Sequence, residues 1–205
     1  MKRALMSIFV LLGFGLLANS ANATIVYNDG GVHEINADLF QAVEIYDGPL
    51  NQPTTVKLLL GGEIRDIDVY EHSIFYMTGG KIYGTFALHN FGQAEISGGI
   101  VNQDPFYVFN NSRLTITGGQ VSEPLRMFES CEVYVHGTDF KIDGVPVPYG
   151  PVAVTTGRLT GTLLYGQIQL PFVIQDNSKL VLVPEPATIL LLSLGILTLP
   201  KKRRP

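Results

Sequence analysis

The chain has 205 residues, of which 46% are hydrophobic and 16% are charged, and its formal net charge is −4. The acidic balance argues against nucleic-acid binding, because Lys and Arg at phosphates dominate that affinity. The single cysteine, Cys131, excludes an intramolecular disulfide, so stability must come from burial and hydrogen bonding, and we expect this thiol to be packed rather than reactive.

The N-terminus has the three parts of a secretory signal. Lys2 and Arg3 precede an apolar stretch at residues 4–17, and Ala21 and Ala23 form a small-x-small cleavage site. The apolar stretch is shorter than the ~20 residues that span a bilayer as a helix. We therefore predict a cleaved signal helix at residues 1–23, which implies the Sec translocon and signal peptidase as partners.

Residues 24–60 are less regular than the sequence that follows. Strand-like stretches at 43–48 and 56–60 flank residues 49–55. This segment contains Pro49 and Pro53, and we expect it to form a loop. We predict an irregular first coil that caps the N-terminal end, since repeat folds need atypical terminal units.

Residues 61–145 contain an internal repeat. Gly-Gly pairs recur at intervals of 18, 19 and 20 residues, and the positions two and four before each later pair are apolar. A unit of this length cannot bury its apolar positions alone, so the units must stack. The pairs, which we place at the corners, are Gly61 and Gly62, Gly79 and Gly80, Gly98 and Gly99, and Gly118 and Gly119.

This pattern predicts an all-β fold, a small right-handed parallel β-helix of about four regular coils with irregular flanks. Period-2 alternation ends at each glycine corner, and like residues would stack at the ~4.8 Å strand spacing. The alternative is an antiparallel β-sandwich, which also has short strands and glycine turns. Columnar repetition favours the solenoid.

Two groups of polar residues are candidates for chemistry. Asp66 and Asp68 lie two apart on a predicted strand and could form a carboxylate pair or a weak metal site. A solvated outer face is the favoured interpretation, since later units do not repeat the pair. A second group falls near one point of successive units, and a structural ladder is favoured over a metal site: His72, His89, Asn110, Asn111 and Glu129.

Two further columns are visible in the aligned repeats. Tyr76 and Tyr134 share an outward position and could contact polysaccharide, although tyrosine is also favoured on half-buried strands. Thr78, Ser97 and Thr117 form one short hydroxyl row, which gives an ice-binding surface little support. Serine-nucleophile, phosphate-loop, dinucleotide and HExxH motifs are missing from the sequence. We therefore expect no catalytic residues and no cofactor.

The C-terminal part divides into a β segment and a tail. Residues 146–183 begin with prolines that interrupt pairing and continue as strand-and-turn patterns. Residues 184–205 consist of Pro184-Glu185-Pro186, an apolar run at 187–199 and a basic cluster. Basic residues beside an apolar segment favour the cytoplasmic side, which leaves everything upstream outside the inner membrane. The cluster is Lys201, Lys202, Arg203 and Arg204.

This tripartite tail resembles the PEP-CTERM sorting signal of exported proteins from Gram-negative bacteria that make extracellular polysaccharide. The segment leading into Pro184 is similar to the end of many β-solenoid proteins that carry this signal. The resemblance implies a hydrophobic C-terminal helix and processing by an exosortase, a membrane-embedded cysteine protease. It also implies a body that is anchored transiently, facing the periplasm, before release to the cell surface or beyond.

These observations predict an exported, non-enzymatic surface or matrix protein, with exopolysaccharide as a candidate partner. Without the two terminal segments, residues 24–183 hold eight basic and 17 acidic residues, a net charge of −9. A β-helix polysaccharide lyase or hydrolase is the alternative, by analogy of fold and through Asp66 and Asp68. An ice-binding-like surface protein is a lesser alternative.

Overall fold

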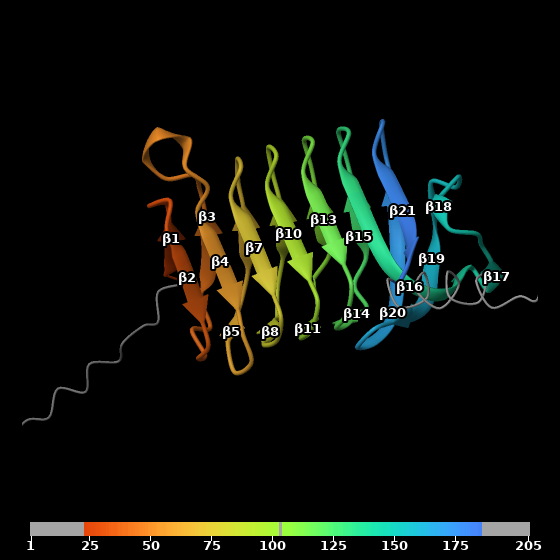
Figure 1. Ribbon diagram of the computed structural model, residues 1–205, viewed down its shortest axis with the longest axis horizontal. Coiled ribbons are helices and arrows are strands. Elements are labelled where there is room, and N and C mark those ends of the chain that lie inside the picture. The colour runs from red at the N-terminus through yellow and green to blue at the C-terminus, as the bar shows by residue number, and fades with distance from the viewer. Residues whose placement is uncertain (1–22, 103, 186–205) are drawn as a thin grey trace, which may run out of the picture.

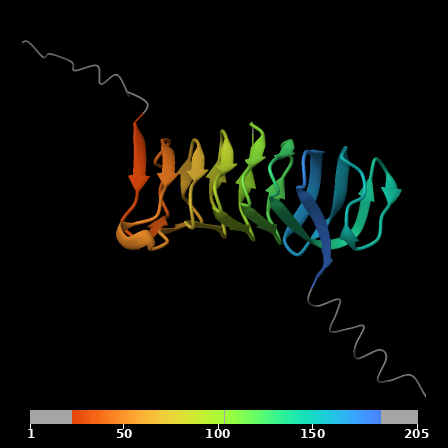
Figure 2. The same ribbon diagram turned by 90° about the horizontal axis from the view of Figure 1, so that it is seen from above.

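The computed structural model describes residues 23–102 and 104–185, which form a β-solenoid of about six turns (Figure 1). Within these residues the chain has 21 strands, one short 3-10 turn, η1 (Pro49–Asn51), and no α-helix. The predictions of an all-β fold and of a parallel β-helix are confirmed. The coils stand in a row, and a group of longer strands closes the C-terminal end (Figure 2).

The coils contribute strands to three faces, of which the first coil supplies two. The first face stacks parallel strands in this order: β1 (Thr24–Tyr27), β3 (Ala42–Ile45), β6 (Ile67–Val69), β9 (Phe86–Leu88), β12 (Phe106–Val108), β15 (Leu125–Met127) and the end of β20 (Gly166–Ile174). The second face stacks β2 (Val32–Ile35), β4 (Thr55–Leu58), β7 (Ile74–Met77), β10 (Gln93–Ile96), β13 (Arg113–Ile116), β16 (Glu132–Ile142) and β21 (Lys179–Pro184).

The third face is built from two-residue strands. It stacks β5 (Glu63–Ile64), β8 (Lys81–Ile82), β11 (Ile100–Val101), β14 (Gln120–Val121) and the start of β20. Strand β20 bends from the third face to the first, since its Ile168 pairs with Val121 and its Phe172 pairs with Leu125.

The core runs along the axis of the solenoid. Alternate residues point inward, and those predicted to share a column do so: Phe75 pairs with Ala94, and Met77 pairs with Ile96. Three phenylalanines fill the centre, with the ring centroids of Phe86 and Phe106 5.0 Å apart and those of Phe75 and Phe86 5.8 Å apart. All three side chains are fully buried.

Two of the three corners between the faces have turns with positive φ that recur from coil to coil. At the glycine corners, the second glycine of three pairs has a positive φ, as at Gly99 (+85°), which non-glycine residues rarely adopt. At the opposite corner, tight turns place Asn90, Asn110 and Asn111 in the left-handed region that Asn tolerates best among side chains with a Cβ.

The solenoid is longer than the predicted four regular coils. Strands β1 to β4, within the segment expected to be irregular, already stack in register on the coils that follow. The loop at residues 46–54, which contains η1, enlarges this coil and hides the repeat in the sequence. At the other end, β20 and β21 return to the stack as its last turn.

A β cap covers the C-terminal end. The second half of β16, β17 (Val145–Pro146), β18 (Gly150–Pro151) and β19 (Thr156–Leu163) pair antiparallel with each other or with β20 and β21. Phe140, Leu159 and Leu163 are buried beneath these strands and extend the core. The predicted β segment at 146–183 therefore closes the solenoid.

The terminal predictions fall mostly outside the described residues. Ala23 lies directly before β1, and Pro184, the last residue of β21, pairs with Gly137. Residues 1–22, including Ala21, and residues 186–205, including Pro186 and the basic cluster, lie outside the described part of the chain. In the part that is described, no helix has the length and apolar character needed to cross a membrane.

Glu132 links three coils on the second face. Its carboxylate accepts hydrogen bonds from Tyr134 (2.9 Å) and Arg113 (3.1 Å), and Lys179 lies 3.6 Å away. The hydrogen bond from Tyr134, followed by that from Arg113, holds the pKa of Glu132 below its ordinary value. Its stabilisation is therefore present above the ordinary pKa and is lost as the pH falls through the lowered one.

Glu132→Gln should weaken the acid dependence of stability. At pH 7 the variant should lose about 0.2–1 kcal/mol of unfolding free energy, since the ion pairs are partly solvated. Below about pH 4 the difference in unfolding free energy between variant and parent should shrink, because the parent carboxylate is then protonated and as uncharged as the glutamine. Urea unfolding from pH 3 to pH 7 measures this. Glu129→Gln, which removes a carboxylate without an ion pair to a described residue, is the control.

Phe86→Ala should destabilise the solenoid by about 3–5 kcal/mol, because it removes a fully buried ring between two others. Phe91→Ala removes a ring that is 51% exposed and should cost less than about 1 kcal/mol. Guanidinium unfolding followed by far-UV circular dichroism measures both. Equal losses would contradict the assignment of Phe86 to the core.

Candidate functional site

The structure gives Asp66 and Asp68 separate partners. Asp66 lies at the corner before β6, where it accepts hydrogen bonds from Arg65 Nε (2.6 Å) and the Thr85 backbone N–H (2.9 Å). Asp68 lies on β6, with Oδ1 3.2 Å from His89 Nε2. Among the described residues no group of three or more His, Cys, Asp and Glu side chains could hold a metal ion. Asp66 thus stabilises a corner, and Asp68 positions an imidazole.

The predicted polar ladder is divided between different columns. His89 stacks on Tyr70 (ring centroids 4.6 Å apart), whereas His72 stacks on Phe91 (5.5 Å) and bonds Asp47 through Nδ1 (3.0 Å). The expectation that His72 and His89 share a column is therefore wrong. Tyr70 and His72 are two residues apart at the same turn, and the sequence does not show which of them aligns with His89 unless the end of each strand is known.

A column of stacked rings follows this corner along five coils. Adjacent rings are 4.5–5.1 Å apart and within 13° of parallel, and we call them the ring column: Tyr46, Tyr70, His89, Phe109 and Phe128. Because each ring covers its neighbour, solvent meets mainly ring edges. Burial and the nearby Glu44 carboxylate raise the pKa of Tyr46, so its hydroxyl stays protonated. The ring column thus strengthens the corner and offers few open faces to a ligand.

The two tyrosines proposed for polysaccharide contact lie on the second face. Tyr134 lies beneath the Arg113 guanidinium, 5.4 Å from its ring centroid, and donates to Glu132. Tyr76 lies three coils away toward the N-terminus, and Glu95 and Thr115 occupy the two positions between the tyrosines. These two rings do not form a continuous platform. The hydroxyls of Ser97 and Thr117, in the predicted row, donate to backbone carbonyls of the preceding coil at 3.4 Å.

Cys131 is fully buried, as predicted for a packed thiol. Its sulfur lies 3.4 Å from Ser178 Oγ on the next coil. Burial raises the pKa of the Cys131 thiol, which keeps it protonated and unreactive at neutral pH.

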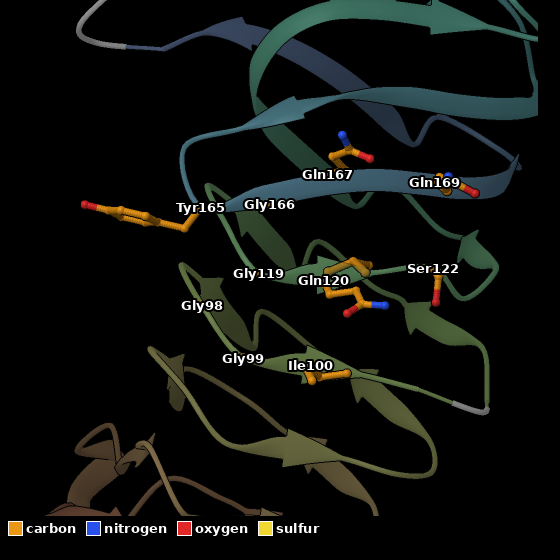
Figure 3. A pocket seen from close by; sticks show the side chains of 11 residues that line it. Gly98, Gly99, Ile100, Gly119, Gln120, Ser122, Tyr165, Gly166, Gln167 and Gln169 are labelled. Atoms are coloured by element: carbon orange, nitrogen blue, oxygen red, sulfur yellow. The ribbon is translucent and has the colours of Figure 1, made fainter.

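A groove of about 660 Å³ lies on the third face, where the last regular coils meet the hairpin of β19 and β20 (Figure 3). Three successive rungs line it: residues 98–100, residues 119–122, and residues 165–167 with Gln169. Its volume is within the ~300–1,000 Å³ of small-molecule sites. We call this hollow the amide groove, after its three glutamines.

Glycines shape the amide groove because side chains do not fit there. A Cβ on Gly166 would lie 2.2 Å from the carbonyl oxygen of Gly119, and one on Gly99 would lie 2.6 Å from that of Gly79. The backbone N–H of Gly119 donates to the Tyr165 carbonyl (3.3 Å), which fixes the hairpin tip on the glycine corner. The corners that organise the repeat therefore also form the floor of the groove.

The polar side chains in the amide groove are uncharged and available to a ligand, and they lie beside the apolar side chains of Ile100 and Val121. Gln120, Gln167 and Gln169 form no side-chain hydrogen bond with any described residue. Ser122 donates weakly to its neighbour Glu123 (3.4 Å). Tyr165, at the hairpin tip and at the edge of the groove, is 73% exposed, unlike the rings of the ring column (Figure 3).

The sequence patterns did not indicate this groove. The repeat alignment marked Gly98, Gly99, Gly118 and Gly119 only as corners, and the return of β20 beside β14 depends on the hairpin. The available signal was the exposed pair Leu164-Tyr165 before Gly166, which forms a two-residue hairpin turn, followed by Gln167 and Gln169 on alternate positions.

No family model, curated protein or solved structure matches the chain.

Gly166→Ala should separate the hairpin tip from the glycine corner, since its Cβ meets the carbonyl oxygen of Gly119. We expect a loss of about 1–3 kcal/mol of unfolding free energy. Tyr165→Ala removes an exposed ring and should change stability by less than about 0.5 kcal/mol. Thermal and urea unfolding of both variants measure this. A Gly166→Ala variant as stable as the parent would contradict the close contact.

Proposed function

We propose that the chain is an exported, non-enzymatic protein of the cell surface or extracellular matrix that binds exopolysaccharide in the amide groove. The observation that carries the proposal is the combination, in one hollow, of an exposed tyrosine and amides that have no hydrogen-bond partner among the described residues. Sugars present many hydroxyls that both donate and accept, and a carboxamide offers both functions.

Tyr165 complements the amides. A tyrosine combines an apolar ring with a polar hydroxyl, which suits a ligand with apolar C–H faces and polar edges. Its position on a hairpin tip leaves both the ring and the hollow behind it open to a polymer. A polymer needs such an open groove, because its chain must enter and leave the site.

The route to this site follows from the two ends of the sequence. The signal at residues 1–23 would deliver the body across the inner membrane, and the C-terminal hydrophobic helix would hold it there with the basic cluster inside. An exosortase would then process the tail at the Pro184-Glu185-Pro186 motif. The acidic body supports this destination, since it suits a soluble exported domain.

Residues 24–185 provide a direct test, since the whole core from Ile35 to Leu182 lies within them. This body should be retained on immobilised native exopolysaccharide from the source organism. Tyr165→Ala should reduce retention at least severalfold, and Tyr149→Ala, which removes an exposed ring on the cap, should not. Lack of retention of the parent body would refute the proposal, and equal retention by the Tyr165→Ala variant would remove the groove from it.

The proposed route has its own test. In the source organism, changing Pro184 and Glu185 to alanine should leave the full chain in the inner-membrane fraction, while the parent protein appears at the cell surface or in the medium as a shorter product. Fractionation and mass spectrometry of the C-terminus measure this. A parent protein that keeps residues 186–205 after export would contradict processing.

A further inference from the structure

We infer that the amide groove takes an uncharged polysaccharide, a ligand class that depends on the proposed function. Every side chain lining the groove is neutral, from Ile100 and Gln120 to Gln167 and Gln169. A site for uronate, sulfate or phosphate groups would need Arg or Lys, because charged acceptors are best satisfied by charged donors.

Two carboxylates at the corners beside the third face are unfavourable for an anionic polymer. Asp104 lies in the corner that follows β11, and Glu123 lies in the corner that follows β14. Two cations lie on neighbouring strands. Across the hairpin, Lys141 pairs with Thr160, the partner of Gln169, and on the third face Lys81 pairs with Ile100. The Lys81 ammonium is held by Glu63 Oε1 of the neighbouring rung at 2.9 Å, which raises the pKa of Lys81 and gives the pair no net charge.

The charge of the whole body acts in the same direction. With a net charge of −9 over residues 24–183, long-range repulsion would slow the approach of an acidic polymer, most strongly at low salt. A neutral polymer meets no such barrier. Charge therefore selects against one class of ligand, and the amides provide hydrogen bonds for the other.

The dimensions of the groove limit the bound segment. Three rungs at the ~4.8 Å strand spacing extend about 10 Å along the axis, which accommodates only a few sugar units. Affinity should therefore rise with oligosaccharide length over the first few units and then stay constant. Binding to a long polymer would gain further only from the number of segments available.

Dextran and dextran sulfate form a matched pair of probes, since they share a backbone and differ in charge. The native exopolymer, separated by anion exchange into neutral and acidic fractions, is the second pair. We expect the body to be retained by the neutral fraction and excluded from the acidic fraction, and dextran sulfate to bind no better than dextran at 20 mM or 150 mM salt. Affinity electrophoresis measures all four.

Variants connect this selectivity to the groove. Gln120→Leu and Gln167→Leu should each lower retention on the neutral fraction severalfold, since each removes a donor and an acceptor. Gln93→Leu, on the exposed side of the second face, should not change it. Glu123→Gln should leave neutral binding unchanged and increase the weak binding of dextran sulfate.

The outcomes separate the two proposals. Retention by the acidic fraction alone would overturn the inference of an uncharged ligand, while exopolysaccharide binding would stand. Retention by neither fraction would overturn both. Neutral retention that is unaffected by Gln120→Leu and Gln167→Leu would place binding elsewhere and overturn the assignment to the amide groove.

Discussion

Each coil of the solenoid must place its backbone N–H and C=O groups opposite those of the next coil, about 4.8 Å away, and the rest of the structure depends on this in-register stacking. Stacking brings like residues together, so the inward apolar residues of successive coils form a continuous core. It also forces the corners to approach closely. At Gly99 the backbone of the neighbouring coil leaves no space for a Cβ, and both Gly99 and Gly119 have a positive φ that disfavours other residues, so the glycines recur.

Many side chains on the outer surface of the stack contact side chains of neighbouring coils. The ring column covers one corner, and the ion pairs of Glu132 and of Lys81 with Glu63 connect rungs on the second and third faces. Asp68 and His89 belong to the same kind of contact. Side chains at repeated positions thus tend to find stacking or ion-pair partners within the protein. A ligand site requires a break in the repetition, and the hairpin of β19 and β20 provides one.

The sequence predicted the parts of the fold that repeat locally. The Gly-Gly spacing gave the corners, and the apolar positions before each pair gave the register, so that Phe75 pairs with Ala94 as expected. The regular stacking of the first coils was not predicted because the loop at 46–54 changes the repeat length. The last coil was not predicted because the chain reaches it through an antiparallel hairpin. Asp66 and Asp68 are two residues apart in the sequence, but Asp66 lies at a corner and Asp68 lies on β6, so the two carboxylates have different partners.

The amide groove could not be predicted from the sequence, because it depends on a tertiary contact. Its lining combines a glycine corner of the repeat with a hairpin tip from the cap, and their contact, from Gly119 N–H to the Tyr165 carbonyl, is a tertiary one. Glutamines on an exposed strand look like ordinary solvated residues until the opposite wall is present. Since the hairpin closes the solenoid and also forms this wall, the same element ends the repetition and creates the hollow. A cap that must cover the last coil thereby leaves, at its edge, a concave site with amide groups that bond no other residue of the described chain.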